Sequence, residues 1–129
     1  MSNEKILLVE DSPLNRRLTE AVLKPRGYRV LVAEDGQQGI DLAAAELPDL
    51  ILMDVQLPGV SGYDATRILK SRPETRHIPI VALTAHAMTD ERDRAIAAGC
   101  DGYIVKPIDT RAFPDQVREY LLRPEPGQS

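Results

Sequence analysis

Several short apolar runs in this sequence stop at residues that can bind a metal ion or a phosphoryl group. The clearest run, residues 50–53, is followed directly by Asp54 and is bounded by Pro48 on one side and Pro58-Gly59 on the other. Such runs are typical of parallel strands that are buried on both faces. The polar residues that end or follow four of the runs are Glu10-Asp11, Asp54, Thr84 and Lys106.

These residues are far apart in the sequence, but a parallel sheet would bring them together. Because all strands of such a sheet present their carboxyl ends to one edge, we expect a common site at that edge. Its three carboxylates and one ammonium carry a formal charge of −2, which one divalent cation would neutralise. An all-oxygen set of ligands with no His or Cys suits a hard ion, so the sequence predicts Mg²⁺ as the cofactor.

The same residues could receive a phosphoryl group. An aspartate can attack phosphorus as a nucleophile when a metal ion and hydrogen-bond donors hold the phosphoryl oxygens. Asp54 would be that nucleophile, and Mg²⁺, Lys106 and Thr84 would each hold one oxygen. Each of these acids taken alone is more commonly a solvated loop residue or a turn cap. The occurrence of suitable residues at all four strand ends favours the common site.

The elements that would position these residues can be predicted from hydrophobic periodicity. We expect strands at residues 6–9, 29–33, 50–53, 80–83 and 102–105, each followed by a helix. The helices begin near residues 13, 37, 61, 90 and 110, and the first follows a Ser12-Pro13 cap. This alternation predicts an α/β fold with a doubly wound, five-stranded parallel sheet and five helices.

The first helix has a repeating set of apolar residues that predicts its buried face. These residues are Leu14, Leu18, Ala21 and Val22. Pro25 and Gly27 stop the pattern, and Pro25 is close enough to its end to shorten the helix.

Length and composition limit the possible functions. A chain of 129 residues and 14.3 kDa, with 43% hydrophobic and 28% charged residues, suffices for one globular domain. We assign residues 1–122 to this domain and residues 123–129, which are polar and rich in proline, to a flexible C-terminal tail. No apolar run could span a bilayer and the N-terminus does not resemble a signal peptide, so we expect a cytoplasmic domain with no membrane contact. The N-terminal Met and the length of 129 residues favour a free-standing domain over one excised from a hybrid kinase.

Cysteine content and charge exclude two further classes. The single cysteine, Cys100, rules out an internal disulfide framework and a multi-cysteine metal site. The net charge is −4, and acidic and basic residues are intermixed along the sequence. The sequence therefore predicts no basic surface that could bind nucleic acid.

Five short motifs resemble a known family. E-D-S near the start, L-M-D, the following P-G, V-A-L-T-A and Y-I-V-K-P occur in the order found in the receiver domain of bacterial two-component response regulators. The similarity extends from about residue 5 to residue 122. It is strongest to single-domain receivers of the DivK cell-cycle type and to receivers attached to hybrid histidine kinases. The resemblance implies a flavodoxin-like sheet with the strand order 2-1-3-4-5.

The resemblance also implies a role for each residue of the predicted site. Asp54 would be the phosphoacceptor and a metal ligand, and Lys106 would pair with a phosphoryl oxygen. Asp11 would bind Mg²⁺ directly, Glu10 would bind it through water, and the backbone carbonyl of Gln56 would supply a further ligand. Glu10-Asp11 replaces the commoner Asp-Asp pair of this family, which is a conservative change.

A conformational switch is implied as well. Thr84 would move toward the phosphoryl group, Tyr103 would turn inward behind it, and the Lys106-Pro107 peptide bond would be cis. The surface that changes would be formed by the fourth helix, the fifth strand and the fifth helix, and would include His86, Met88 and Tyr103. On residue type alone, Tyr103 is equally well explained as core and His86 as a solvated loop residue.

The implied partners are proteins. A sensor histidine kinase or a histidine phosphotransfer protein would donate the phosphoryl group, and a downstream target would bind the switching surface. The donor would dock on the first helix, at positions Asn15, Arg16, Leu18, Thr19 and Val22. The domain would accept and slowly hydrolyse the phosphoryl group, so we interpret it as a signalling switch and not as an enzyme.

Three other classes of protein agree less well with these residues. A phosphotransferase of the haloacid-dehalogenase type requires a second acid two residues after the nucleophile, and Gln56 occupies that position. A dinucleotide-binding fold requires a glycine-rich turn after the first strand, where this chain has Glu-Asp-Ser-Pro. The third alternative, a receiver-shaped interaction module that is not phosphorylated, is disfavoured because the full set of site residues is intact.

Overall fold

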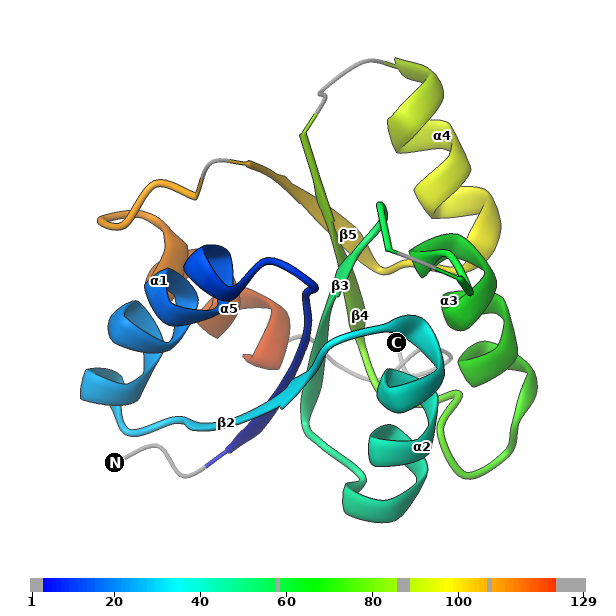
Figure 1. Cartoon of the computed structure of the whole chain (residues 1–129), viewed down its shortest axis with the longest axis horizontal. Helices are drawn as coiled ribbons and strands as arrows, with labels where there is room; N and C mark the ends of the chain where they lie inside the picture. The colour runs from blue at the N-terminus through cyan, green and yellow to red at the C-terminus, as the bar shows by residue number, and fades with distance from the viewer. Residues whose placement is uncertain (1–3, 58, 86–88, 107, 123–129) are drawn as a thin grey trace.

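The sheet has the predicted architecture. The computed structural model describes residues 4–57, 59–85, 89–106 and 108–122, with the backbone alone at 89–91. Its parallel strands pair in the order β2-β1-β3-β4-β5 (Figure 1), as predicted. They are β1 (Lys5–Val9), β2 (Arg29–Ala33), β3 (Leu50–Asp54), β4 (Ile80–Thr84) and β5 (Gly102–Val105).

Helices cover both faces of this sheet. Figure 1 shows α1 and α5 together on one face and α2 and α3 on the other, with α4 beside α3. They are α1 (Pro13–Leu23), α2 (Gly36–Glu46), α3 (Gly62–Ser71), α4 (Thr89–Ala98) and α5 (Phe113–Leu122). No helix within the described ranges is both long and apolar enough to cross a bilayer. The predicted tail, residues 123–129, lies outside the described residues.

Two apolar layers form because successive side chains of a strand point to opposite faces. In β1, Ile6 and Leu8 pack toward α5 with Phe113, whereas Leu7 and Val9 pack toward α2 with Ile40. Every residue of β3 and β4 is buried, as expected for central strands with helices on both sides. The sheet is therefore a rigid base from which residues at its carboxyl edge project.

Each of the first three helices begins at this edge with a capped turn. The side chains of Ser12, Asp35 and Ser61 accept hydrogen bonds from the backbone N–H groups three residues later, at 3.3, 2.8 and 3.1 Å. The first of these caps was predicted from Ser12-Pro13. The loops that follow β1, β2 and β3 are therefore anchored at the helix that each one enters.

The predicted buried face of α1 is only partly right, because Val22 alone of its four residues packs against the core. Leu14 is 74% exposed, Leu18 is 37% exposed and Ala21 is also exposed, whereas Thr19 and Leu23 are buried. Thr19 can be buried because its hydroxyl donates to the Asn15 carbonyl at 2.9 Å, which leaves no unsatisfied donor. The helix ends at Leu23, and Pro25 lies in a separate 3₁₀ turn, η1 (Lys24–Arg26), as its position had suggested. Consequently α1 presents two leucines to solvent.

Candidate functional site

The predicted site residues converge at the carboxyl edge of the sheet. Asp54 ends β3, Thr84 ends β4, and Glu10 and Lys106 directly follow β1 and β5. Glu10 and Asp54 are each only 2% exposed. Strand β1 pairs with β3 up to Val9 and Met53, so the two acids follow adjacent residues of neighbouring strands.

Lys106 lies between the two buried carboxylates. Its Nζ is 3.1 Å from Oε1 of Glu10 and 3.2 Å from Oδ2 of Asp54. Its backbone N–H donates to the carbonyl of Thr84 at 2.6 Å, which anchors the residue to the end of β4. One ammonium therefore neutralises part of the charge of two acids that would otherwise repel each other.

Backbone donors hold the remaining carboxylate oxygens. The N–H of Gln56 donates to Oδ1 of Asp54 at 3.0 Å, and the N–H of Ser12 donates to Oε2 of Glu10 at 3.3 Å. These contacts fix both carboxylates in orientation. Each carboxylate is thus held by a backbone N–H group two residues further along the chain.

The electrostatic state of the site follows from burial and crowding. Burial raises the pKa of Glu10 above its usual value, the contact with Asp54 raises it further, and Lys106 offsets only part of the effect. For Lys106, burial alone would lower the pKa, but the carboxylates of Asp54 and Glu10 outweigh burial and raise it. The site therefore retains an excess of negative charge and favours a bound cation.

A metal ion fits this arrangement. Carboxylate oxygens of Glu10, Asp11 and Asp54 lie within 4.8 Å of one another. Oxygens on opposite sides of a Mg²⁺ ion are about 4.2 Å apart, since each bond is about 2.1 Å long. Asp11 is exposed and can turn toward the ion, whereas the oxygens of Glu10 are already engaged by Lys106 and Ser12. The three acids are thus close enough together to share one ion.

The predicted switch residues lie close to the site. Thr84 is buried at the end of β4. Tyr103 is half-buried and packs against a small cluster formed by Val55, Ala82 and Ala95. His86, Met88 and the Lys106-Pro107 peptide bond lie outside the described residues. The structure thus brings Glu10, Asp11, Asp54, Gln56, Thr84 and Lys106 to one edge and places Tyr103 just behind it.

Two contributors to the site were not identified from the sequence. The N–H of Ser12 binds Glu10, although the residue was expected only to cap α1. Gly62 begins α3 so close to β3 that a Cβ atom there would lie 2.1 Å from the carbonyl oxygen of Asp54. The Ser in E-D-S could have suggested the first contribution, but nothing in the sequence states which backbone Gly62 approaches.

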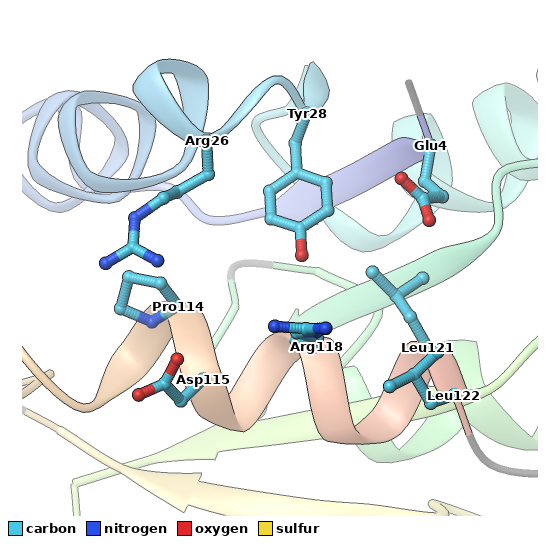
Figure 2. A pocket seen from close by; sticks show the side chains of 8 residues that line it. All are labelled: Glu4, Arg26, Tyr28, Pro114, Asp115, Arg118, Leu121 and Leu122. Atoms are coloured by element: carbon cyan, nitrogen blue, oxygen red, sulfur yellow. The ribbon is translucent and has the colours of Figure 1, made fainter. Parts of the chain in front are cut away.

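Two hollows in the surface lie outside the cluster of acids. One has a volume of about 350 Å³. Figure 2 shows that it is lined by residues of α5 together with Tyr28, Arg26 and Glu4. Glu4 and Tyr28 precede β1 and β2, so this hollow is at the opposite edge of the sheet from Asp54. A second hollow borders Val55 and Gln56 and reaches Arg94 of α4.

Comparisons with known proteins agree with the geometry. A family model described as the response regulator receiver domain matches residues 6–118. The polar-differentiation response regulator DivK of Brucella anthropi is 42% identical over 118 residues, which span 92% of this chain and 96% of DivK. DivK of Brucella ovis shows the same identity and coverage.

Solved structures give the same result. A response regulator from Chloroflexus aurantiacus has a TM-score of 0.90 at 30% identity, covering 95% of this chain and 100% of its own. The receiver domain of a Pseudomonas aeruginosa sensor histidine kinase, described with a magnesium ion coordinated in its active site cleft, has a TM-score of 0.86 at 38% identity. That match covers 93% of this chain and 98% of the kinase receiver.

The fold and the family match thus define a receiver domain of signalling proteins, a class whose members are generally phosphoacceptors and not true enzymes. The chain belongs to the response regulator receiver domain family. It is a receiver of two-component signalling and is similar to DivK, and its family binds Mg²⁺ at the acidic site.

Proposed function

We propose that Asp54 accepts a phosphoryl group from a phosphohistidine on a sensor histidine kinase or a histidine phosphotransfer protein. The observation that carries the proposal is the placement of a nearly buried Asp54 against Lys106 at 3.2 Å, beside two further acids. A lone buried aspartate would be unfavourable, whereas this arrangement suits phosphoryl transfer. The same proposal locates the chain in the cytoplasm, where ATP-dependent kinases supply phosphohistidine.

The reaction requires an oxygen of Asp54 to attack the phosphorus atom in line with the donor histidine. The new bond joins the Asp54 carboxylate oxygen to phosphorus, and the phosphorus–nitrogen bond breaks with its electron pair left on the imidazole. The Gln56 N–H holds Oδ1 of Asp54 in place. Bound Mg²⁺ supplies positive charge that stabilises the phosphoryl oxygens. The carboxylates of Asp11 and Asp54 and the backbone carbonyl of Gln56 would hold the ion directly, with Glu10 acting through water.

Lys106 and Thr84 have complementary tasks in this scheme. Lys106 already contacts Asp54, so its ammonium can follow the negative charge from the carboxylate to a phosphoryl oxygen. Thr84 lies at the end of the neighbouring strand, from which its hydroxyl can approach another oxygen. Movement of Thr84 would leave space for Tyr103 to turn inward and would alter the surface of α4, β5 and α5 that binds a target.

The exposed leucines of α1 support a docking surface for the donor. Leu14 and Leu18 are on the solvent side of α1. Leu18 also borders a narrow hollow that reaches Glu10 and Lys106. A partner that covers Leu14 and Leu18 would therefore lie next to the acceptor. Thr19, which the family resemblance placed among the docking positions, is buried.

Intact mass spectrometry tests the proposal. The protein is incubated with Mg²⁺ and acetyl phosphate, beside an Asp54→Asn variant and a sample in EDTA. We expect one added phosphoryl group in the first sample and none in the two controls. Absence of labelling in the wild type, under conditions that label another receiver, would favour a module that binds its partners without phosphorylation.

A further inference from the structure

Glu10 is held at each of its polar groups. Its backbone N–H donates to the carbonyl of Ala33 at 2.9 Å, and its two carboxylate oxygens accept from Lys106 and Ser12. The remaining group, its backbone carbonyl, accepts a hydrogen bond from Nη1 of Arg16 at 2.9 Å. A side chain of α1 thus holds the peptide bond between Glu10 and Asp11.

The guanidinium of Arg16 has a second partner. Its other terminal nitrogen, Nη2, is 3.5 Å from Oε1 of Glu34, which follows β2. Arg16 is only 17% exposed, whereas Glu34 is 69% exposed. Glu34 is itself anchored, since its N–H binds the side chain of Gln38. Arg16 therefore links α1 to the ends of β1 and β2.

The bond to the carbonyl constrains Asp11. The carbonyl of Glu10 and the N–H of Asp11 belong to one rigid peptide plane, so a donor that fixes the carbonyl also fixes the direction in which the chain enters Asp11. Asp11 is exposed, and no hydrogen bond of its carboxylate is recorded in the described part of the chain. The placement of its carboxylate therefore depends on the backbone that carries it.

We propose that Arg16 is a positioning residue of the magnesium site, which acts by holding the Glu10–Asp11 peptide so that Asp11 faces the same ion as Asp54. The inference rests on the proposed function in that it assumes the acids bind Mg²⁺. Removal of a group that orients a metal ligand typically weakens metal binding by about 10- to 100-fold.

The sign of the effect separates this role from simple electrostatics. Arg16 carries a positive charge close to a cation site, so its removal should tighten Mg²⁺ binding if charge alone mattered. If Arg16 positions Asp11, its removal weakens binding in spite of the lost repulsion. The two explanations thus predict opposite changes in the dissociation constant.

Isothermal titration calorimetry with Mg²⁺ decides between them. Arg16→Met keeps the aliphatic part of the side chain and removes both donors. We expect the dissociation constant of this variant for Mg²⁺ to be roughly tenfold higher than that of the wild type. Arg17→Met is the matched control, because Arg17 is the next residue of α1 and is exposed. Its dissociation constant should stay within about twofold of the wild type, as is usual for exposed charges.

Arg16→Lys supplies a second variant that retains the charge. A lysine can contact either the Glu10 carbonyl or Glu34 but lacks the planar fork that reaches both, so we expect an intermediate affinity. Circular dichroism in EDTA checks that each variant is folded. If Arg16→Met proves unfolded, weaker binding by folded Arg16→Lys still supports the proposal, and wild-type affinity in Arg16→Lys overturns it.

Failure of this inference can be distinguished from failure of the proposed function. If the wild type binds Mg²⁺ and is labelled by acetyl phosphate, but Arg16→Met binds as tightly or more tightly, only the role of Arg16 is refuted. If the wild type binds no Mg²⁺, both the role of Arg16 and the proposed metal site are refuted. Labelling of Arg16→Met should recover when Mg²⁺ is raised above its weakened dissociation constant.

Discussion

Burial of Glu10 beside Asp54 disfavours its ionised form in the folded protein. Its carboxyl is buried beside Asp54, and its pKa is raised above the ordinary value of 4.5. The folded state therefore binds a proton more tightly than the unfolded state does. Stability from this group is present below pH 4.5 and is lost as pH rises through the higher pKa of the folded protein.

Glu10→Gln should consequently stabilise the protein in EDTA. Glutamine keeps one acceptor oxygen, which can bind Lys106 or Ser12, and removes the buried charge, so we expect a gain of about 1 kcal/mol near neutral pH. Urea unfolding over a range of pH measures the gain, which should disappear toward acid pH. Glu119→Gln, at an exposed position of α5, serves as the control and should change little. Lower stability of Glu10→Gln at neutral pH would contradict the assigned electrostatics.

At the level of secondary structure, the start of α3 determines how the backbone of Asp54 is supported. Gly62 brings the helix into contact with β3, because its missing side chain leaves room for the carbonyl of Asp54 and for Cα of Val55. A Cβ atom at 2.1 Å from that carbonyl cannot be accommodated without a shift of α3 or of the acceptor. The neighbour is backbone, so no side-chain movement can relieve the clash.

We therefore expect Gly62→Ala to lower stability and to slow labelling of Asp54. An overpacked contact of this kind typically costs about 1–3 kcal/mol. Thermal unfolding and the rate of labelling by acetyl phosphate are the two measurements. Gln37→Ala, an exposed position early in α2, is a control that should leave both unchanged. Unaltered stability and labelling in Gly62→Ala would show that the close approach is unimportant.

Helix α4 is anchored by small side chains. Among its described side chains, the buried ones are Ala95 and Ala98, while Ile96 is 59% exposed. By contrast, α5 buries Phe113, Pro114 and Val117. Less apolar area holds α4 to the sheet, which is consistent with the proposal that α4 belongs to the surface that switches.

Hydrogen exchange should reveal this difference. We expect the backbone amides of α4 to exchange faster than those of α5 in the unphosphorylated protein, because opening α4 exposes less apolar surface. Exchange followed by mass spectrometry on peptides from the two helices provides the comparison. Equal or greater protection of α4 would argue against its role as the mobile part of the switching surface.

On the scale of the whole molecule, binding of Mg²⁺ should be linked to stability. An ion that binds only the folded protein stabilises it by about 2.7 kcal/mol at 100 times the dissociation constant. The midpoint temperature of thermal unfolding should therefore rise as Mg²⁺ is added and return to its original value when EDTA is supplied in excess. Asp11→Asn should largely abolish the shift while remaining folded in EDTA. A Mg²⁺-dependent shift that persists in this variant would place the ion elsewhere.

Most of the fold could be predicted because periodicity and turn residues agree throughout the chain. The strand 102–105 and the strand 29–33 have the bounds that were expected. The meeting of Glu10, Asp54, Thr84 and Lys106 also followed from the rule that parallel strands share one carboxyl edge. These features depend on local patterns and on general rules of topology.

The predictions that failed or were missing concern contacts between side chains and distant backbone. Leu14 and Leu18 have helical spacing, but spacing alone does not state which face of α1 meets the sheet, and Thr19 occupies the buried side instead. The bond from Arg16 to the Glu10 carbonyl and the approach of Gly62 to Asp54 depend on three-dimensional distances. Neither has a signature in a single sequence.

The central claim is that Asp54 itself carries the phosphoryl group, and locating the modification by chemistry tests it most directly. After labelling with acetyl phosphate and Mg²⁺, borohydride converts an aspartyl phosphate to homoserine, and peptide mass spectrometry identifies the altered residue. Our account predicts homoserine at position 54 and unmodified Asp11 and Glu10. Homoserine at another acid, or labelling that persists in Asp54→Asn, would contradict it.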